Sequence, residues 1–399
     1  MEDLIYLDHA ATTPVDRRVI EAMWPYLASD FGNPSSRHPL GESAARAVDW
    51  ARETVAAALG ASPGEIVFTS GGTESDNLAI VGAALARRDR ADHGKRGDHG
   101  IDHVITTAIE HSAVLEPCRH LARHFGFRLT ELPVDRFGVV DLDALERALD
   151  GSTVLVSVMA ANNEVGTLEP IRQISALTRE RGVLLHTDAV QAAGVLPLDV
   201  DSLGIDLLSI SAHKIHGPKG VGALYVRRGT PLHPLLRGGG QEKGLRSGTE
   251  NVPGVVGLAT ALQIAEAERP ECVPRVRSLR DRLIEGVLTA VPEALLTGHE
   301  TERLPGHASF CFPGVEGEAV LVELGARGIC CSSGSACHAG STEPSHVLTA
   351  LGIPPAVAHT AVRLSLGRDT TAAEIDAVLA ALPEVVAGLR APSAPTRTS

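Results

Sequence analysis

One lysine stands where an amine could do covalent chemistry. Lys214, in SAHKIHGPKG (211–220), directly follows the apolar run DLLSIS (206–211). Because burying an ammonium group is costly, a lysine at the end of a buried strand suits a Schiff base with a carbonyl compound. Alternatively, the side chain has already left the strand and reached water. The residue alone leaves both interpretations open.

A carboxylate follows a second apolar run. Asp188 lies in HTDAVQ (186–191), at the end of a predicted strand. A carboxylate beside a pyridine nitrogen keeps that nitrogen protonated, which makes the ring an electron sink. An aspartate here could also cap a helix. Asn163 and Gln191 could donate hydrogen bonds to a ring oxygen, although each could equally be a turn or surface residue.

Cys337 has the most reactive setting among the six cysteines. It lies in CSSGSACHAGSTEPS (331–345), a stretch of small residues that we expect to form a mobile loop. His338, when protonated, would favour the thiolate. The absence of a regular cysteine framework favours reduced thiols over disulfides. The remaining cysteines are expected to be packing residues: Cys118, Cys272, Cys311, Cys330 and Cys331.

Two segments could bind anions. TSGGTE (69–74) is a Gly-rich turn that opens a helix, and Thr73 in it could bind a phosphate, although a plain turn would show the same pattern. Arg363, between apolar residues, could bind a substrate carboxylate or form an internal ion pair. His213 and His216 lack a third ligand at a recognised spacing, so no metal site is predicted.

The elements that must position these residues alternate between strands and helices. Strand-like runs cover 65–70, 103–108, 154–158, 183–186, 206–211 and 222–226. This alternation predicts a mainly parallel sheet with helices on both faces. Unusual polar residues follow the carboxyl ends of five of these strands: Thr73, His111, Asn163, Asp188, His213 and Lys214. Ligands bind beyond such strand ends, so we expect one shared site.

The length of 399 residues predicts two domains. We expect a large domain over residues 15–255 and a small domain, which carries the Cys337 loop, over residues 1–14 and 256–390. The tail 391–399 lacks large apolar residues and is expected to be disordered. The polar stretch 87–103 is expected to be a loop-like surface insertion.

Charge and hydropathy exclude some classes of function. The net charge of −13 argues against direct nucleic-acid binding. No apolar run is long enough to cross a membrane. The N-terminus, MEDLIYLDHAATTP, has no basic segment followed by an apolar stretch, so we expect no signal peptide and a cytoplasmic location.

Ten motifs in one order resemble a known family from about residue 5 to about residue 385. They are YLDHAATTP, FGNPSS, TSGGTESDN, EHSAV, NNEVG, HTDAVQ, SAHKIHGPKG, GGGQEKGLRSGTEN, SSGSAC and VRLSLGR. Together they resemble the cysteine desulfurases of the nitrogenase and iron–sulfur-cluster type, within the class V aminotransferases. The long segment around SSGSAC resembles the first of the two desulfurase groups, which has a long mobile cysteine loop.

The resemblance implies a fold-type I enzyme that depends on pyridoxal 5'-phosphate (PLP). Its large domain would hold a mixed, mainly parallel, seven-stranded sheet. The implied catalytic residues are Cys337 as nucleophile, Lys214 as the covalent PLP anchor and His111 as a ring-stacking proton carrier. The implied cofactor-binding residues are Thr73, Asn163, Asp188, Gln191, Ser211, His213, Lys214 and, from the neighbouring subunit of a homodimer, Thr249. Asn33 and Arg363 would bind the substrate carboxylate.

The resemblance implies conversion of L-cysteine to L-alanine, with the sulfur held as a persulfide on Cys337. A sulfur-acceptor protein, such as an iron–sulfur scaffold or a thiolation enzyme, would then receive it. Delivery to DNA phosphorothioation is also open. His338 stands where Thr or Ser is common, so a selenocysteine lyase remains an alternative, as does another class V aminotransferase. The alternative from a different class of protein is a non-catalytic scaffold that relays sulfur.

Overall fold

A mixed sheet of seven strands forms the centre of the larger part of the molecule. The computed structural model describes residues 4–94, 100–334 and 344–391. The strand order is β2-β8-β7-β6-β5-β3-β4, and β8 alone runs antiparallel to its neighbours. The strands are β2 (Ile66–Thr69), β3 (His103–Thr107), β4 (Arg128–Leu132), β5 (Thr153–Ser157), β6 (Leu184–Asp188), β7 (Leu207–Ser211) and β8 (Gly222–Val226). The mainly parallel sheet predicted from the sequence is confirmed.

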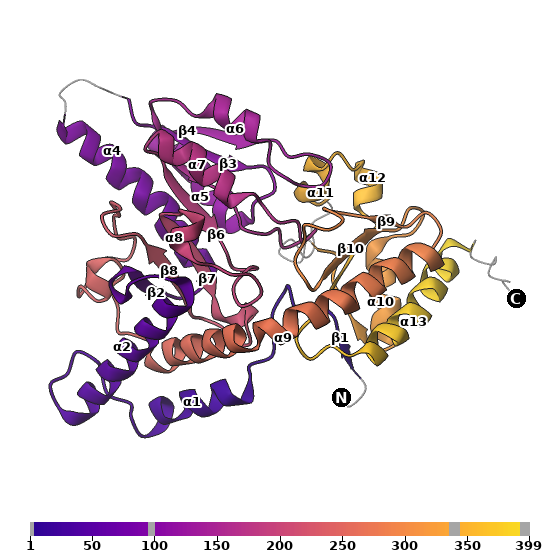
Figure 1. Cartoon of the computed structure of the whole chain (residues 1–399), viewed down its shortest axis with the longest axis horizontal. Helices are drawn as coiled ribbons and strands as arrows, with labels where there is room; N and C mark the ends of the chain where they lie inside the picture. Colours follow the sequence, from indigo (N-terminus) through magenta and orange to yellow (C-terminus); the bar gives the residue numbers. More distant parts are fainter. Residues whose placement is uncertain (1–3, 95–99, 335–343, 392–399) are drawn as a thin grey trace, which may run out of the picture.

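Helices cover both faces of this sheet (Figure 1). Successive strand residues point to opposite faces, so Ile105 packs into the apolar core on one face and Val104 into the core on the other. The helices of this part are α1 (Arg17–Ala28), α2 (Pro39–Leu59), α3 (Gly72–Asn77), α4 (Ala83–Gly94), α5 (Ser112–Phe125), α6 (Leu142–Ala148), α7 (Ile171–Glu180) and α8 (Val200–Leu203). A π-helical turn, Leu78–Gly82, joins α3 to α4.

The C-terminal part has its own core around a three-stranded antiparallel sheet of order β12-β10-β9. Its strands are β9 (Leu295–Leu296), β10 (His307–Cys311) and β12 (Ala361–Ser365), and β1 (Ile5–Tyr6) pairs in parallel with β11 (Ile329–Cys330). Its helices are α10 (Gly317–Ala326), α11 (His346–Ala350), α12 (Pro355–Ala358) and α13 (Ala372–Arg390). The N-terminal strand therefore lies in this part.

One long helix, α9 (Val252–Ala290), joins the two parts. Figure 1 shows it running from beneath the large sheet to the C-terminal part. It passes through residue 255, where the sequence predicted the domain join. That division of the chain into domains stays a prediction.

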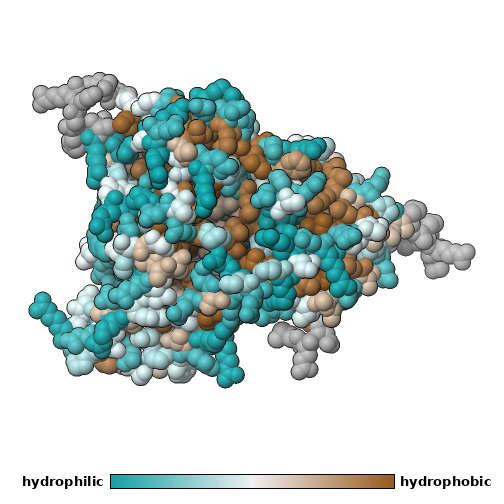
Figure 2. Space-filling model, viewed as in Figure 1, coloured by the Kyte–Doolittle hydropathy of each residue, from teal (hydrophilic) through white to brown (hydrophobic). Residues whose placement is uncertain are grey.

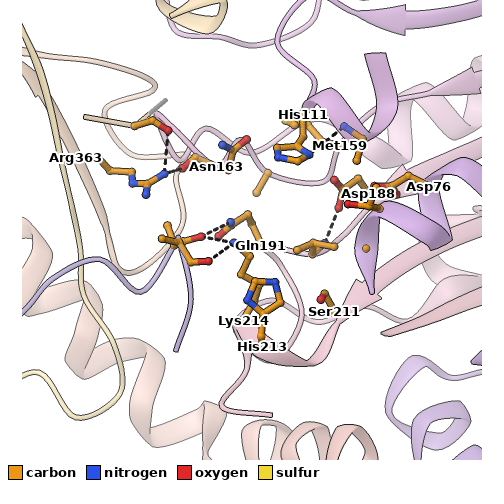
Figure 3. A pocket seen from close by; sticks show the side chains of 18 residues that line it. Asp76, His111, Met159, Asn163, Asp188, Gln191, Ser211, His213, Lys214 and Arg363 are labelled. Atoms are coloured by element: carbon orange, nitrogen blue, oxygen red, sulfur yellow. Dashed lines mark hydrogen bonds between the residues drawn. The ribbon is translucent and has the colours of Figure 1, made fainter. Parts of the chain in front are cut away.

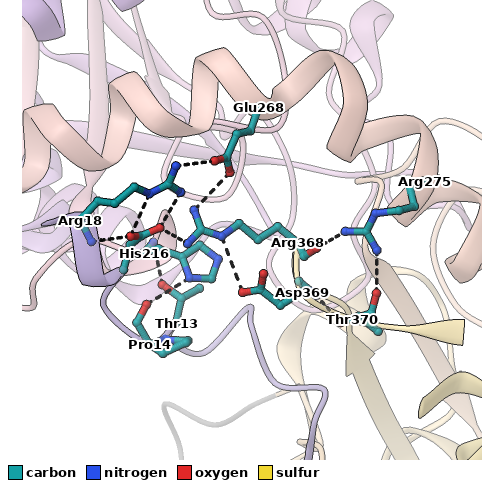
Figure 4. Close-up of polar contacts among 11 residues, drawn as sticks. Thr13, Pro14, Arg18, His216, Glu268, Arg275, Arg368, Asp369 and Thr370 are labelled. Atoms are coloured by element: carbon teal, nitrogen blue, oxygen red, sulfur yellow. Dashed lines mark hydrogen bonds and ion pairs between the residues drawn. The ribbon is translucent and has the colours of Figure 1, made fainter. Parts of the chain in front are cut away.

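A network of ion pairs ties the N-terminal segment to both parts (Figure 4). Asp16 caps α1 and accepts hydrogen bonds from Arg18 and from Arg368, which follows β12. Glu268 on α9 lies 2.8 Å from Arg18 and 3.4 Å from Arg368. Three chain segments, distant in sequence, therefore meet through four charged side chains.

The expected surface insertion at 87–103 is partly wrong. Residues 87–94 continue α4, since Ala and Arg are strong helix formers. His103 is buried in β3, where its ring nitrogens lie 3.0 Å from Thr153 Oγ1 and 2.8 Å from Thr130 Oγ1. Residues 95–99 lie outside the described part of the chain.

Polar residues cover much of the face that Figure 2 shows. Among the described residues, no helix is long and apolar enough to cross a membrane.

Candidate active site

A cavity of about 290 Å³ lies beyond the carboxyl ends of the large sheet's strands. It collects the six polar residues that the sequence placed after strand ends, together with Gln191, Ser211 and Arg363. In Figure 3, Arg363 lies at one end and Asp188 at the other, with His111 and Lys214 between them. Among these polar residues, Thr73 and Arg363 are farthest apart in the sequence, at 290 positions.

Lys214 lies in a single 3-10 turn directly after β7. Its Nζ atom donates to the backbone oxygens of Ala10, at 2.5 Å, and Ala11, at 2.8 Å. The side chain is half-buried and so has not left the strand for bulk water. Because both acceptors belong to the N-terminal segment, this segment holds the amine in the cavity. Gln191 Nε2 also donates to Ala10, at 3.0 Å.

Asp188 closes the far end of the cavity, at the last position of β6. Its Oδ1 accepts a hydrogen bond from the backbone N–H of Val190, at 2.8 Å. Burial raises the pKa of Asp188, while that N–H and the charges of His111 and Lys214 oppose the rise. A cationic partner in the cavity would therefore stabilise the ionised carboxylate.

His111 is the N-cap of α5 and forms the wall of the cavity opposite Lys214. Its Nδ1 accepts from the backbone N–H of Ala113, at 3.1 Å. When the imidazole is neutral, this contact leaves the ring proton on Nε2. The cap thus fixes both the tautomer and the orientation of the ring.

The Gly-rich turn, with neighbours from β7 and its following turn, forms another wall of the cavity. Gly72, at the start of α3, lies so close to Val190 that a Cβ atom there would be 2.8 Å from Val190 Cγ2. Thr73, Ser211 and His213 line both the cavity and an open hollow beside it. Burial, together with the charge of Lys214, lowers the pKa of His213 to about 4, so this ring is neutral at pH 7.

Arg363 reaches the cavity from β12 and is almost fully buried. One Nη atom donates to Asp8 Oδ1 and the other to the backbone oxygen of Asn163, both at 2.8 Å. The buried Nε atom has no hydrogen-bond partner among the described residues. An unsatisfied buried donor of this kind is rare in proteins. The sequence did not single out Asp8.

Two of the predicted residues that the structure describes, Asn33 and Thr249, do not line this cavity. Asn33 is exposed, and its Oδ1 accepts from the N–H of Ser35 at 2.9 Å. Thr249 is exposed on the segment before α9. Cys337 lies outside the described residues, although Gly334, three positions earlier, lines the cavity. The roles of these three residues stay predictions.

Comparisons with known proteins give a consistent result. The aminotransferase class-V family matches residues 5–378. The chain belongs to this family. A cysteine desulfurase IscS of Methanosarcina thermophila is 50% identical over 386 residues, covering 97% of this chain and 93% of the relative. The chain is therefore a member of the cysteine desulfurases within the class-V aminotransferases, as the sequence motifs indicated.

Solved structures agree. A NifS-like protein is 41% identical in sequence and has a TM-score of 0.88. The match covers 97% of this chain and 100% of the NifS-like chain. SspA in complex with cysteine is 38% identical and has a TM-score of 0.78. The match covers 92% of this chain and 100% of the SspA chain. The fold is thus that of the NifS-like, fold-type I enzymes.

Cysteine desulfurases of this family depend on PLP, and the cavity fits that cofactor. A buried carboxylate at one end suits a pyridine nitrogen, and a lysine amine in the middle suits the aldehyde. Gly72 and Thr73, in the Gly-rich turn at the start of α3, line the same cavity, where backbone N–H groups and a hydroxyl suit a phosphate. The carboxylate, the lysine amine and the Gly-rich turn belong to separate elements of the fold, so each supports the fit to PLP independently.

Proposed function

We propose that this cysteine desulfurase works on L-cysteine in the cavity described above and transfers its sulfur to Cys337. The observation that carries the proposal is the placement of a lysine amine between a carboxylate at one end and an arginine at the other. That order suits a cofactor ring at the Asp188 end and a small amino acid at the Arg363 end.

In this proposal the chain's own residues hold the cofactor and move protons. Asp188 pairs with the pyridine nitrogen, and Asn163 and Gln191 contact the ring hydroxyl. Lys214 would hold the aldehyde, and its amine would exchange protons with the substrate. His111 stacks on the ring and carries protons through Nε2. Bound PLP supplies an electron sink for the carbanion that forms when the substrate loses its α-proton.

The phosphate and the substrate carboxylate would occupy opposite sides of the cavity. Thr73, Ser211 and His213 would bind the phosphate, with neutral His213 acting as a hydrogen-bonding partner rather than a charge. Arg363, held by its contacts with Asp8 and Asn163, would bind the substrate carboxylate together with Asn33. The position of Arg363 at the end of the cavity opposite Asp188 supports this assignment.

Cys337 would act as the nucleophile. Its thiolate attacks the substrate sulfur, so that an S–S bond forms while the bond from sulfur to the substrate's β-carbon breaks. Protonation of the carbon fragment gives alanine, and Cys337 keeps a persulfide. Four of the other five cysteines are poorer candidates, because burial raises the pKa of their thiols. The pKa is raised for Cys118 and Cys272, to about 11 for Cys311 and to about 12 for Cys331.

We propose that a second copy of the chain completes the site. Apolar side chains on the outward face of α1 are exposed to solvent, with Ile20 at 51%, Trp24 at 64% and Leu27 at 60%. Such a stripe on a helix indicates a protein contact. The hollow beside Thr73 is open, so Thr249 of a partner subunit could reach the phosphate there.

The final acceptor of the sulfur is proposed to be another protein. The persulfide must leave Cys337 before the next turnover, and an acceptor thiol can take it by exchange. The similarity to an IscS protein favours an iron–sulfur scaffold over a thiolation or phosphorothioation enzyme.

The test is turnover of L-cysteine by full-length enzyme loaded with PLP, measured as alanine released and persulfide formed on the protein. We expect Lys214→Ala to lose the absorbance of the bound cofactor, and Cys337→Ser to keep PLP but lose the persulfide. Cys272→Ser is the matched control and should behave as the wild type. Continued desulfuration by Cys337→Ser would refute the role of Cys337. Turnover of selenocysteine but not cysteine would indicate a selenocysteine lyase.

A further inference from the structure

A second carboxyl group, that of Asp76, lies beside Asp188 at the end of the cavity. Asp76 is on α3, is only 1% exposed and lines the cavity. Figure 3 shows the two carboxyl groups next to each other, at the end opposite Arg363. None of the roles proposed above uses Asp76, although its carboxyl group interacts electrostatically with that of Asp188.

The contacts of Asp76 do not suit a negative charge. Its Oδ1 atom is buried and has no hydrogen-bond partner among the described residues. The Nε2 atom of His186 lies 3.5 Å from it and is nearer to Ser209 Oγ, at 3.0 Å. Burial lowers the pKa of His186 to about 3, so this imidazole is neutral and offers no compensating charge. An ionised carboxylate with such neighbours would be poorly stabilised.

The two carboxyl groups differ in what faces them. Burial raises the pKa of Asp76 and the negative charge of Asp188 raises it further, while a hydrogen bond from Ser209 opposes the rise and the charge of Glu110 adds to it. Burial also raises the pKa of Asp188, but the charges of His111 and Lys214 and a backbone N–H oppose that rise. Two adjacent carboxyl groups in such a site cannot both ionise readily, so a shared proton resides on the group with the weaker stabilisation.

We propose that Asp76 is a positioning residue for Asp188: as a neutral carboxylic acid it fills the space behind Asp188 and leaves the negative charge on the carboxylate that faces the cofactor ring. This inference rests on the proposed role of Asp188 toward PLP. Without the acid, water would enter behind Asp188 and weaken its interaction with the pyridine nitrogen. If Asp76 were ionised, repulsion between the two carboxylates would favour a proton on Asp188.

The proposal predicts opposite results for two substitutions. Asp76→Asn keeps the shape and the neutrality, so full-length apoenzyme should bind PLP within about twofold of the wild-type affinity. The absorbance of the bound cofactor should keep its pH midpoint. Asp76→Ala should bind PLP at least about tenfold more weakly and shift that midpoint, because a charge-assisted interaction is lost or solvated.

Glu169 provides a matched control. It is a buried carboxyl with an unpartnered Oε1 atom, burial raises its pKa to about 8, and it does not line the cavity. Glu169→Gln should leave both the PLP affinity and the pH midpoint unchanged. Thermal unfolding of each apoenzyme, measured separately, reports any loss of stability. If Asp76→Ala gives no folded protein, Asp76→Ser takes its place under the same criteria.

Two outcomes would overturn the inference: Asp76→Asn losing PLP as severely as Asp76→Ala, or Asp76→Ala binding PLP as the wild type does. Asp188→Ala separates this from a failure of the proposed function. If Asp188→Ala binds PLP normally, the cofactor assignment itself is wrong. If Asp188→Ala loses PLP while Asp76→Ala does not, only the role of Asp76 fails.

Discussion

The charged network at the joint between the two parts of the molecule allows a quantitative test through Asp16. The Asp16 side chain is 7% exposed and accepts hydrogen bonds from the Arg18 N–H, at 2.7 Å, and from the guanidinium groups of Arg18 and Arg368. Asp16→Asn keeps an oxygen to cap α1 but removes the charge. Asp16→Ala removes both.

The magnitude follows from these contacts. A hydrogen bond to a charged group contributes about 1.5–3 kcal/mol, and Arg18 is half-exposed, so we assign about 2 kcal/mol to the charge, mostly through Arg368. Loss of the N-cap adds about 1 kcal/mol. For a unit of about 250 residues, each kcal/mol lowers the melting temperature by about 2 °C. We therefore expect losses of about 4 °C for Asp16→Asn and about 6 °C for Asp16→Ala.

The assay is thermal unfolding of full-length apoenzyme at fixed scan rate. Glu21→Gln, in an exposed pair with Arg17 on the same helix, is the control and should change the melting temperature by less than about 1 °C. Hydrogen bonds from Arg18 and Arg368 hold the pKa of Asp16 well below its usual range. The stabilisation is therefore present above the unfolded-state pKa of about 4 and is lost as the pH falls below it. An Asp16→Asn variant that melts with the wild type at pH 7 would refute the reasoning.

Three further predictions concern the site and its supports. Arg363→Lys should raise KM for L-cysteine at least about tenfold, with a smaller effect on kcat, because lysine lacks the planar fork that binds a carboxylate. Glu242→Ala should cost about 3–5 kcal/mol in denaturant unfolding, since Arg52, at 13% exposure, loses a partner at 2.7 Å, whereas Glu242→Gln should cost less. Gly166→Ala should lower the melting temperature, because φ is +79° and the new Cβ would lie 2.5 Å from His307 Cβ.

The large sheet could be predicted because its central strands carry local signals. Each of the six predicted runs corresponds to an observed strand, from β2 to β8, since buried strands of this kind are short apolar runs that end at polar residues. The clustering of six polar residues in one cavity followed from the same signal, because the strand ends of a mainly parallel sheet meet at one edge.

Elements that are buried on one side only gave a sequence signal too weak to predict them. The strand β4 was missed because Arg128–Leu132, at the edge of the sheet, has three polar residues among five and buries only Leu132 fully. The start of the stretch 87–103 was expected to be a loop because it is charged. A charged sequence with good helix propensity can instead extend a helix whose first turns are packed, as α4 shows.

Contacts between distant segments lie beyond any local pattern. Asp8 and Arg363 are 355 positions apart and meet only because β1 lies in the C-terminal part, close to β12. That ion pair has a consequence for the proposed substrate. Asp8 and Asn163 each hold one Nη atom, so together they fix the orientation of the guanidinium group. If Arg363 binds the substrate carboxylate, as proposed, its side chain is already ordered when the substrate arrives, and the entropy of ordering it is lost during folding.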